Sequence, residues 1–282
     1  MNQICEFAFS ERIRMTKNII GNTFGTVGSK WRDQLAQMII RKRISPNILT
    51  LTGVAINLLG GLLLALGASS HSLLAWKYGT LNWIHFLAGL VILLGNIFDL
   101  LDGAVARMSG HVTKFGAFSD SVMDRYSDLA LFAGAITYFA LRHELAFVVI
   151  GALALVGAVM TSYTRARAES LLPGKYNSGY MERPERIVML IVTCFVNRVN
   201  LGMIFIALFA NLATFHRIWD ARQTAFNLEH PDQANTGYGS PNAPAFVQFL
   251  RSIIFWKYPR QTWQHDALSA LILLVIGISL FI

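Results

Sequence analysis

Apolar runs long enough to cross a bilayer recur along this 282-residue chain, and they constrain its fold more than any other feature. A transmembrane helix needs about 20 consecutive apolar residues. Only 14% of the residues are charged, against about 25% in soluble domains. The sequence therefore predicts an all-α integral membrane protein, a six-helix transmembrane bundle with spans at residues 47–68, 83–98, 117–141, 146–163, 187–195 (extended at both ends) and 201–215.

The two ends of the chain differ from this six-span core at 45–217. Residues 1–44 are predicted to be a cytoplasmic or juxtamembrane segment with an amphipathic helix at the membrane surface. Its apolar residues recur at helical spacing: Trp31, Leu35, Met38 and Ile39. Residues 218–282 are predicted to be a C-terminal extension that begins with a polar linker at 218–243. The apolar segment 268–282 is either a seventh span, as an extra C-terminal membrane helix, or a half-buried helix.

Basic residues distinguish one face of the membrane from the other. The formal net charge is +8, and most of the excess lies at Arg41–Arg43, Lys114, Arg165–Arg186 and Arg217. These positions share one side of the expected bundle, which the positive-inside rule places in the cytoplasm. The charges interrupt apolar spans and do not form a soluble stripe, so the expected partners are membrane lipids and not nucleic acid.

Four aspartates surround the link between the second and third spans. Asp99 and Asp102 are three residues apart and Asp120 and Asp124 are four apart, so each pair shares one helix face. The link at 108–115 is short, so the two helices should be antiparallel neighbours whose acids meet. Such a cluster near a bilayer would cost on the order of 10 kcal/mol without counter-charges. Two Mg²⁺ or Mn²⁺ ions would balance four carboxylates, and we predict such a site.

The residues between these acids suit a nucleotide-linked diphosphate. Gly103 and Ala106 leave room for a base or a phosphate to approach the helix, and Arg107 offers a bidentate phosphate donor. A pair of divalent ions can also clamp a pyrophosphate.

The complete pattern D-x2-D-G-x2-A-R-x8-G-x3-D-x3-D resembles the signature of the CDP-alcohol phosphotransferase family at all eight specified positions, and the resemblance extends over about residues 45–217. It implies that Asp99, Asp102 and Asp120 are the main metal ligands and that Asp124 is both a ligand and the general base. It also implies a CDP pocket formed by Asp102, Gly103, Ala106, Arg107 and Gly116.

Arginines on the same side of the membrane point to the second substrate. Arg165 and Arg167 close span four, and Arg183 and Arg186 open span five. Several guanidinium groups suit a phosphorylated alcohol, although they could also only enforce topology and bind lipid headgroups. The segments around them resemble prokaryotic phosphatidylinositol-phosphate synthases and archaetidylinositol-phosphate synthases. This resemblance implies L-myo-inositol 1-phosphate as acceptor and a prokaryotic plasma membrane as location; glycerol 3-phosphate and a neutral alcohol remain alternatives.

Asp128 continues the acidic stripe one turn beyond Asp124 and lies near Arg125 in the sequence. This Arg125–Asp128 pair is either a second shell that orients the cluster or a structural ion pair.

The expected reaction is transfer of a phosphatidyl-type group from a CDP-linked lipid such as CDP-diacylglycerol to a small polar alcohol, by direct displacement and with release of CMP. A divalent-cation transporter is the alternative from another class, since membrane carboxylates also line ion pathways. That alternative explains the acids but not the glycine, alanine and arginine positions. Glycine-bearing spans are compatible with a homodimer, and equally with packing inside one chain.

Overall fold

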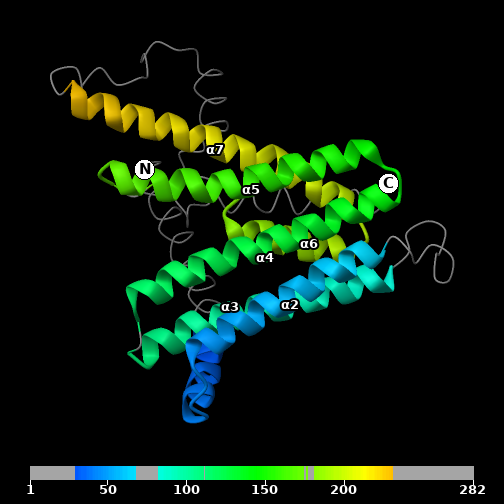
Figure 1. Cartoon of the computed structure of the whole chain (residues 1–282), viewed down its shortest axis with the longest axis horizontal. Helices are drawn as coiled ribbons and strands as arrows, with labels where there is room; N and C mark the ends of the chain where they lie inside the picture. The colour runs from blue at the N-terminus through cyan, green and yellow to red at the C-terminus, as the bar shows by residue number, and fades with distance from the viewer. Residues whose placement is uncertain (1–28, 68–81, 111, 175, 177–180, 231–282) are drawn as a thin grey trace, which may run out of the picture. The chain divides into compact units, whose positions relative to one another are not determined.

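The computed structural model describes residues 29–67, 82–110, 112–174, 176 and 181–230. In these residues the regular elements are helices (Figure 1), which confirms the all-α class for this part of the chain. The first helix covers residues 29–41. The others are α2 (Pro46–Leu66), α3 (Trp83–Met108), α4 (Lys114–Leu141), α5 (Leu145–Leu171), α6 (Arg183–Phe195) and α7 (Val199–Glu229).

Four of these helices, α2, α3, α5 and α7, are long and apolar enough to cross a membrane. Their apolar side chains are widely exposed, as at Leu51, Leu58 and Leu62 of α2, which suits contact with lipid. Helix α4 carries Asp120 and Asp124 in its first half, and α6 has only 13 residues. The structure therefore supports an integral membrane protein, while the count of six spans stays a prediction and the segment 268–282 lies outside the described residues.

The chain divides into two compact units whose boundaries fall inside helices. Unit 1 contains the residues up to Ala55 together with Leu94–Met123, and unit 2 contains Ile56–Leu93 and the residues from Asp124 onward. Helix α4 runs without interruption across one of these boundaries.

In unit 1, the helix at 29–41 buries Ala36 in a small apolar cluster with Leu49, Ala104 and Val105. Trp31 and Met38 stay 66% and 52% exposed on this helix. The predicted amphipathic helix is thus present, and its place at a membrane surface remains a prediction.

Unit 2 has its main core between α5 and α7, which lie side by side (Figure 1). Small residues such as Ala154 and Ala158 of α5 face Ala210 of α7 in the buried cluster. Polar bonds cross the same seam: the amide of Asn211 donates to the carbonyl of Leu153 at 3.0 Å. The seam fixes the register of two helices that supply arginines to the candidate site.

Glycines allow α2 and α4 to touch through their backbones within unit 2. A Cβ atom built on Gly134 would collide with the backbone of Gly61, and one built on Gly61 would collide with the carbonyl of Ala130. The expectation that glycines of the first span permit close helix approach is confirmed at Gly61.

Replacing Gly134 by valine should therefore destabilise the protein strongly, because the colliding atoms are backbone atoms that cannot move aside. We expect the thermal unfolding midpoint in detergent to fall by about 5 °C or more. Ala133→Val is the matched control, since Ala133 is exposed on the same helix. Equal midpoints for the two variants would contradict the close α2–α4 contact.

One expected boundary was wrong. Helix α7 continues to Glu229, so the polar stretch from 218 begins as helix and not as a linker. Residues 218–229 contain no proline or glycine, and Arg222 lies over the ring of Trp219 at 5.7 Å. Helix α6 begins at Arg183, in the expected extension of the span at 187–195, because Glu182 and Glu185 form a capping box.

Candidate functional site

The turn between α3 and α4 brings the signature residues of unit 1 together. Helix α3 ends at Met108, Gly110 adopts a left-handed conformation with φ of 71°, and α4 begins at Lys114. The N–H of Gly116 donates to Oγ1 of Thr113 at 2.9 Å, which caps the start of α4. A Cβ on Gly116 would lie only 2.9 Å from that oxygen, so the cap favours glycine at this position.

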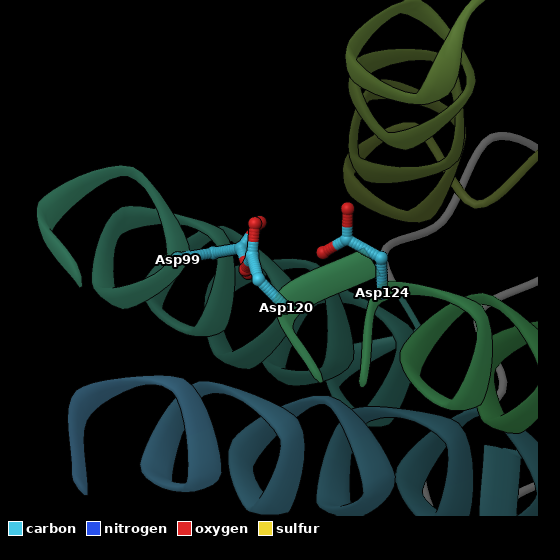
Figure 2. Close-up of side chains that lie close together, drawn as sticks. All are labelled: Asp99, Asp120 and Asp124. Carbon is cyan, nitrogen blue, oxygen red and sulfur yellow. The ribbon is translucent and has the colours of Figure 1, made fainter. Parts of the chain in front are cut away.

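Three of the four predicted acidic ligands lie together. The carboxylates of Asp99 on α3 and Asp120 on α4 point toward one another, and Asp124 follows one turn further along α4 (Figure 2). One oxygen from each of the three lies within 4.8 Å of the others. Asp99 and Asp124 are half-buried, and Asp120 is exposed.

The spacing of these oxygens fits an oxygen-ligated divalent cation. Two ligands of one Mg²⁺ lie at most about 4.2 Å apart, because each bond is about 2.1 Å long. Small side-chain adjustments would therefore bring three oxygens onto one ion. Carboxylates are also the ligands that Mg²⁺ and Mn²⁺ prefer.

Asp102, the fourth predicted ligand, is held differently. It is 4% exposed, and its Oδ2 accepts a hydrogen bond of 2.6 Å from the hydroxyl of Thr50 on α2. It is not among the three grouped carboxylates. Thr50 thus fixes Asp102 from the opposite helix of unit 1.

A cleft of about 190 Å³ opens beside Asp102 within unit 1. All five residues predicted to bind CDP line it, which are Asp102, Gly103, Ala106, Arg107 and Gly116. The rest of the lining comes from the start of α2, the α3–α4 turn and the start of α4, namely Pro46, Asn47, Thr50, Val112, Thr113, Ala117 and Asp120. Glycine, alanine and a guanidinium group give this cleft room and a donor for a phosphate.

In unit 2, Asp124 belongs to a network of charges between α4 and α6. Nη1 of Arg183 lies 2.7 Å from Oδ1 of Asp124, and Nε of the same arginine donates to Asp128 at 3.2 Å. One guanidinium therefore bridges two carboxylates that are one turn apart on α4.

Arg186 completes this network from a buried position. It is 1% exposed, and its guanidinium donates to Oδ2 of Asp128 and to the carbonyl of Met181, each at 2.8 Å. Both carboxylate oxygens of Asp128 thus meet arginines of α6. The expected pair between Arg125 and Asp128 stays a prediction.

A second cluster of charges joins α5, α6 and α7. Arg165 on α5 pairs with Glu169 at 3.3 Å and with Glu182, the N-cap of α6, at 3.6 Å. Arg217 on α7 is 1% exposed, lies 3.5 Å from Glu182 and also donates to the carbonyl of Thr161. Arg167, the fourth predicted acceptor residue, is exposed on α5.

Three residues of these clusters were not predicted to belong to the site. Thr50 was part of the expected first span, Glu182 precedes the arginines that open span five and was given no role, and Arg217 was used only for orientation. The sequence did carry a signal for Glu182, because Glu182 and Glu185 flank Pro184 in the pattern of a helix start. No local pattern links Thr50 to Asp102, or Glu182 to Arg217.

The chain is similar to several known proteins. Residues 43–219 match the family model described as CDP-alcohol phosphatidyltransferase. An archaetidylinositol phosphate synthase of Pyrococcus horikoshii is 31% identical over 191 residues, which are 68% of this chain and 90% of the relative. A phosphatidylinositol phosphate synthase of Corynebacterium glutamicum is 36% identical over 163 residues, which are 57% of this chain and 67% of that protein.

Solved structures show the same fold. The phosphatidylinositol phosphate synthase of Mycobacterium tuberculosis in complex with manganese and citrate matches with a TM-score of 0.58 and 27% identity, over 68% of this chain and 88% of that chain. The same enzyme with CDP-DAG bound matches with a TM-score of 0.57 and 28% identity, over 67% and 92% of the two chains.

Proposed function

Since this chain belongs to the CDP-alcohol phosphatidyltransferase family, we propose that it transfers a phosphatidyl-type group from a CDP-linked lipid to a phosphorylated polar alcohol and releases CMP. Family membership makes the chain a metal-dependent enzyme and sets the cation transporter aside. The first candidate for the acceptor is L-myo-inositol 1-phosphate, and glycerol 3-phosphate is the second. The observation that carries this proposal is the bridge formed by Arg183, which pairs with the predicted base Asp124 and also with Asp128, the partner of Arg186.

The donor binds in the cleft of unit 1. The cytidine and diphosphate lie against the open helix surface at Gly103 and Ala106, and Arg107 donates to a phosphate. Thr50 keeps the carboxylate of Asp102 directed into the same cleft.

Gly103→Val tests this assignment, because a Cβ at Gly103 would make only an ordinary contact of 3.5 Å with the guanidinium of Arg107. The extra methyl groups should reduce the cleft without disturbing the fold. We expect the KM for CDP-diacylglycerol to rise about tenfold or more, with little change in the unfolding midpoint. An unchanged donor KM would show that the nucleotide binds elsewhere.

Asp99, Asp120 and Asp124 hold the divalent cations, with Asp102 as a further ligand and two ions as the proposed number. Bound there, the cations supply positive charge for the diphosphate and for the departing oxygen.

Asp124 accepts the proton of the attacking hydroxyl. The acceptor oxygen forms a bond to the lipid-side phosphorus as the bond from that phosphorus to the CMP oxygen breaks. Arg183 keeps the Asp124 carboxylate directed, and Asp128 in turn holds Arg183. No separate nucleophile is needed for this displacement.

The acceptor phosphate binds to the arginines around this base. Arg165, Arg167 and Arg183 present guanidinium groups that are partly or fully exposed, whereas the buried Arg186 acts by fixing Asp128. Arg217 joins the group because it shares Glu182 with Arg165. The names of the inositol-phosphate relatives support inositol 1-phosphate as the bound alcohol.

The proposed location is a prokaryotic plasma membrane, with the site facing the cytoplasm. The basic groups at Arg41–Arg43 and Arg165–Arg186 support this orientation. A homodimer is also proposed, on the glycine-bearing helices.

The acceptor is tested with purified protein, CDP-diacylglycerol and Mg²⁺ or Mn²⁺. L-myo-inositol 1-phosphate, glycerol 3-phosphate and free myo-inositol are compared by CMP release and by mass spectrometry of the lipid product. We expect phosphatidylinositol phosphate as the main product. If only free inositol reacts, the assignment of the arginines to a phosphorylated acceptor is wrong.

A further inference from the structure

One carboxylate oxygen lies between arginines from two different helices. Oε1 of Glu182 is 3.6 Å from Nη1 of Arg165 on α5 and 3.5 Å from Nη2 of Arg217 on α7. The side chain of Glu182 is 14% exposed, whereas that of Arg217 is 1% exposed. The side chain of Arg165 is 37% exposed, so an anion from solvent reaches this group of charges from the side of Arg165.

The contacts of Glu182 are longer than the tight arginine–aspartate pairs between α4 and α6. Arg183 meets Asp124 at 2.7 Å and Arg186 meets Asp128 at 2.8 Å, the lengths of charge-assisted hydrogen bonds. At 3.5 and 3.6 Å, Glu182 attracts its arginines mainly by Coulomb interaction. Another anion can replace it with a smaller loss of energy than at the tight pairs.

Glu182 also has a partner that does not depend on the arginines. Its side chain accepts a backbone N–H in the first turn of α6, and the side chain of Glu185 accepts the N–H of Glu182 at 3.0 Å. The carboxylate thus keeps a donor if it moves away from Arg165 and Arg217. The buried Arg217 needs a counter-charge at all times, so only an anion can take the place of Glu182.

We propose that Glu182 is an internal counter-anion, which the phosphate of the acceptor displaces from Arg165 and Arg217, and which thereby restricts the acceptor to phosphorylated alcohols. This inference rests on the proposed function in that the acceptor binds at these arginines. A phosphate dianion carries more charge and more acceptor oxygens than a carboxylate, so it can compete. A neutral alcohol supplies no replacement charge and leaves Glu182 in place.

Glu182→Gln removes the competing charge but keeps the size of the side chain and an oxygen that can cap α6. We expect the full-length variant in nanodiscs to bind inorganic phosphate about tenfold more tightly than the unchanged protein, by calorimetry. The KM for inositol 1-phosphate should fall, and the KM for CDP-diacylglycerol should stay the same. Phosphate binding that is unchanged or weaker in the variant would overturn the proposal.

Two controls show whether the effect is specific to Glu182 or follows from the loss of any negative charge. Glu169→Gln removes a carboxylate from Arg165 alone, so it should tighten phosphate binding less than about twofold. Glu144→Gln, which disturbs the pair with Arg142 next to the α4–α5 turn, should leave phosphate binding unchanged. Equal effects of Glu182→Gln and Glu169→Gln would also overturn the proposal.

A third variant covers failure of Glu182→Gln to fold. Glu182→Asp keeps the charge and withdraws it by one methylene, so it should tighten phosphate binding about threefold; no tightening would contradict the proposal.

The binding assay involves no turnover, so it tests the role of Glu182 separately from the reaction. Tighter phosphate binding without transfer to inositol 1-phosphate would reject the acceptor and not the role of Glu182. Transfer without tighter binding would reject only Glu182.

Discussion

Asp124→Asn is expected to lower the rate of CMP release by about 10²–10⁴-fold while CDP-lipid binding stays nearly unchanged. Asparagine keeps the shape of the side chain but cannot accept the proton of the attacking hydroxyl. The donor cleft lies within unit 1 and is not lined by Asp124, so nucleotide affinity should persist when Mn²⁺ is saturating and offsets the loss of one cation ligand. Single-turnover CMP release and equilibrium binding of CDP-diacylglycerol measure the two effects separately.

The ion pair of Asp124 with Arg183 requires a control, because the substitution also weakens that contact. Arg183→Gln removes the same pair but leaves the carboxylate. We expect it to raise the acceptor KM more than it lowers kcat. Asp33→Asn, on the helix at residues 29–41, controls for the loss of one carboxylate far along the chain and should have no effect. A near-normal rate for Asp124→Asn would reject Asp124 as the base.

The helices and the acid cluster were predictable because both follow from local rules. Apolar runs of about 20 residues predict α2 and α3 almost to the residue at their starts. Spacings of three and four residues place acids on one helix face, and a short link makes neighbours of α3 and α4. These local rules suffice to predict that Asp99, Asp120 and Asp124 lie together, as their carboxylates do.

Helix ends were less well predicted because hydropathy was followed more closely than capping signals. The polar residues after 217 suggested a linker, yet they are good helix formers, and the first breaker after them is Pro231. Pro184 and the glutamates around it likewise indicate a helix that starts at Arg183. Greater weight on these residues would have corrected the linker boundary at 218 and would have given the start of α6 to the residue.

Long-range ion pairs could not be predicted from one sequence. The sequence suggested Arg125, three residues away on the same helix, as the partner of Asp128, and it gave no sign of Arg183 and Arg186, which meet Asp128 from more than 50 residues later. Asp128 is 6% exposed and lies where α6 packs against α4, so its partners come from the packing and not from its own helix. Glu182 and Arg217 are linked in the same way.

Removal of the bound cations should abolish transfer. EDTA is expected to lower CMP release to background, and added Mg²⁺ or Mn²⁺ should restore it. The reaction needs positive charge beside the diphosphate, which carboxylates cannot supply. Without cations, the aspartates of the site would repel the diphosphate. The carboxylates of Asp99, Asp120 and Asp124 lie close together, and their negative charge would repel the negatively charged diphosphate unless cations are bound between them.

Asp120→Asn identifies these carboxylates as the place where the cations bind. It removes one anionic ligand from the group, so we expect Mn²⁺ affinity to fall about tenfold or more, as measured by the electron paramagnetic resonance signal of free Mn²⁺. The rate should fall with it and recover partly at high Mn²⁺ concentration, a rescue that the loss of a purely structural residue would not allow. Asp220→Asn, next to His216 on α7, is the matched control and should leave Mn²⁺ affinity unchanged. If both variants bind Mn²⁺ as tightly as the unchanged protein, the three carboxylates do not form the metal site, and the proposed chemistry loses its charge source.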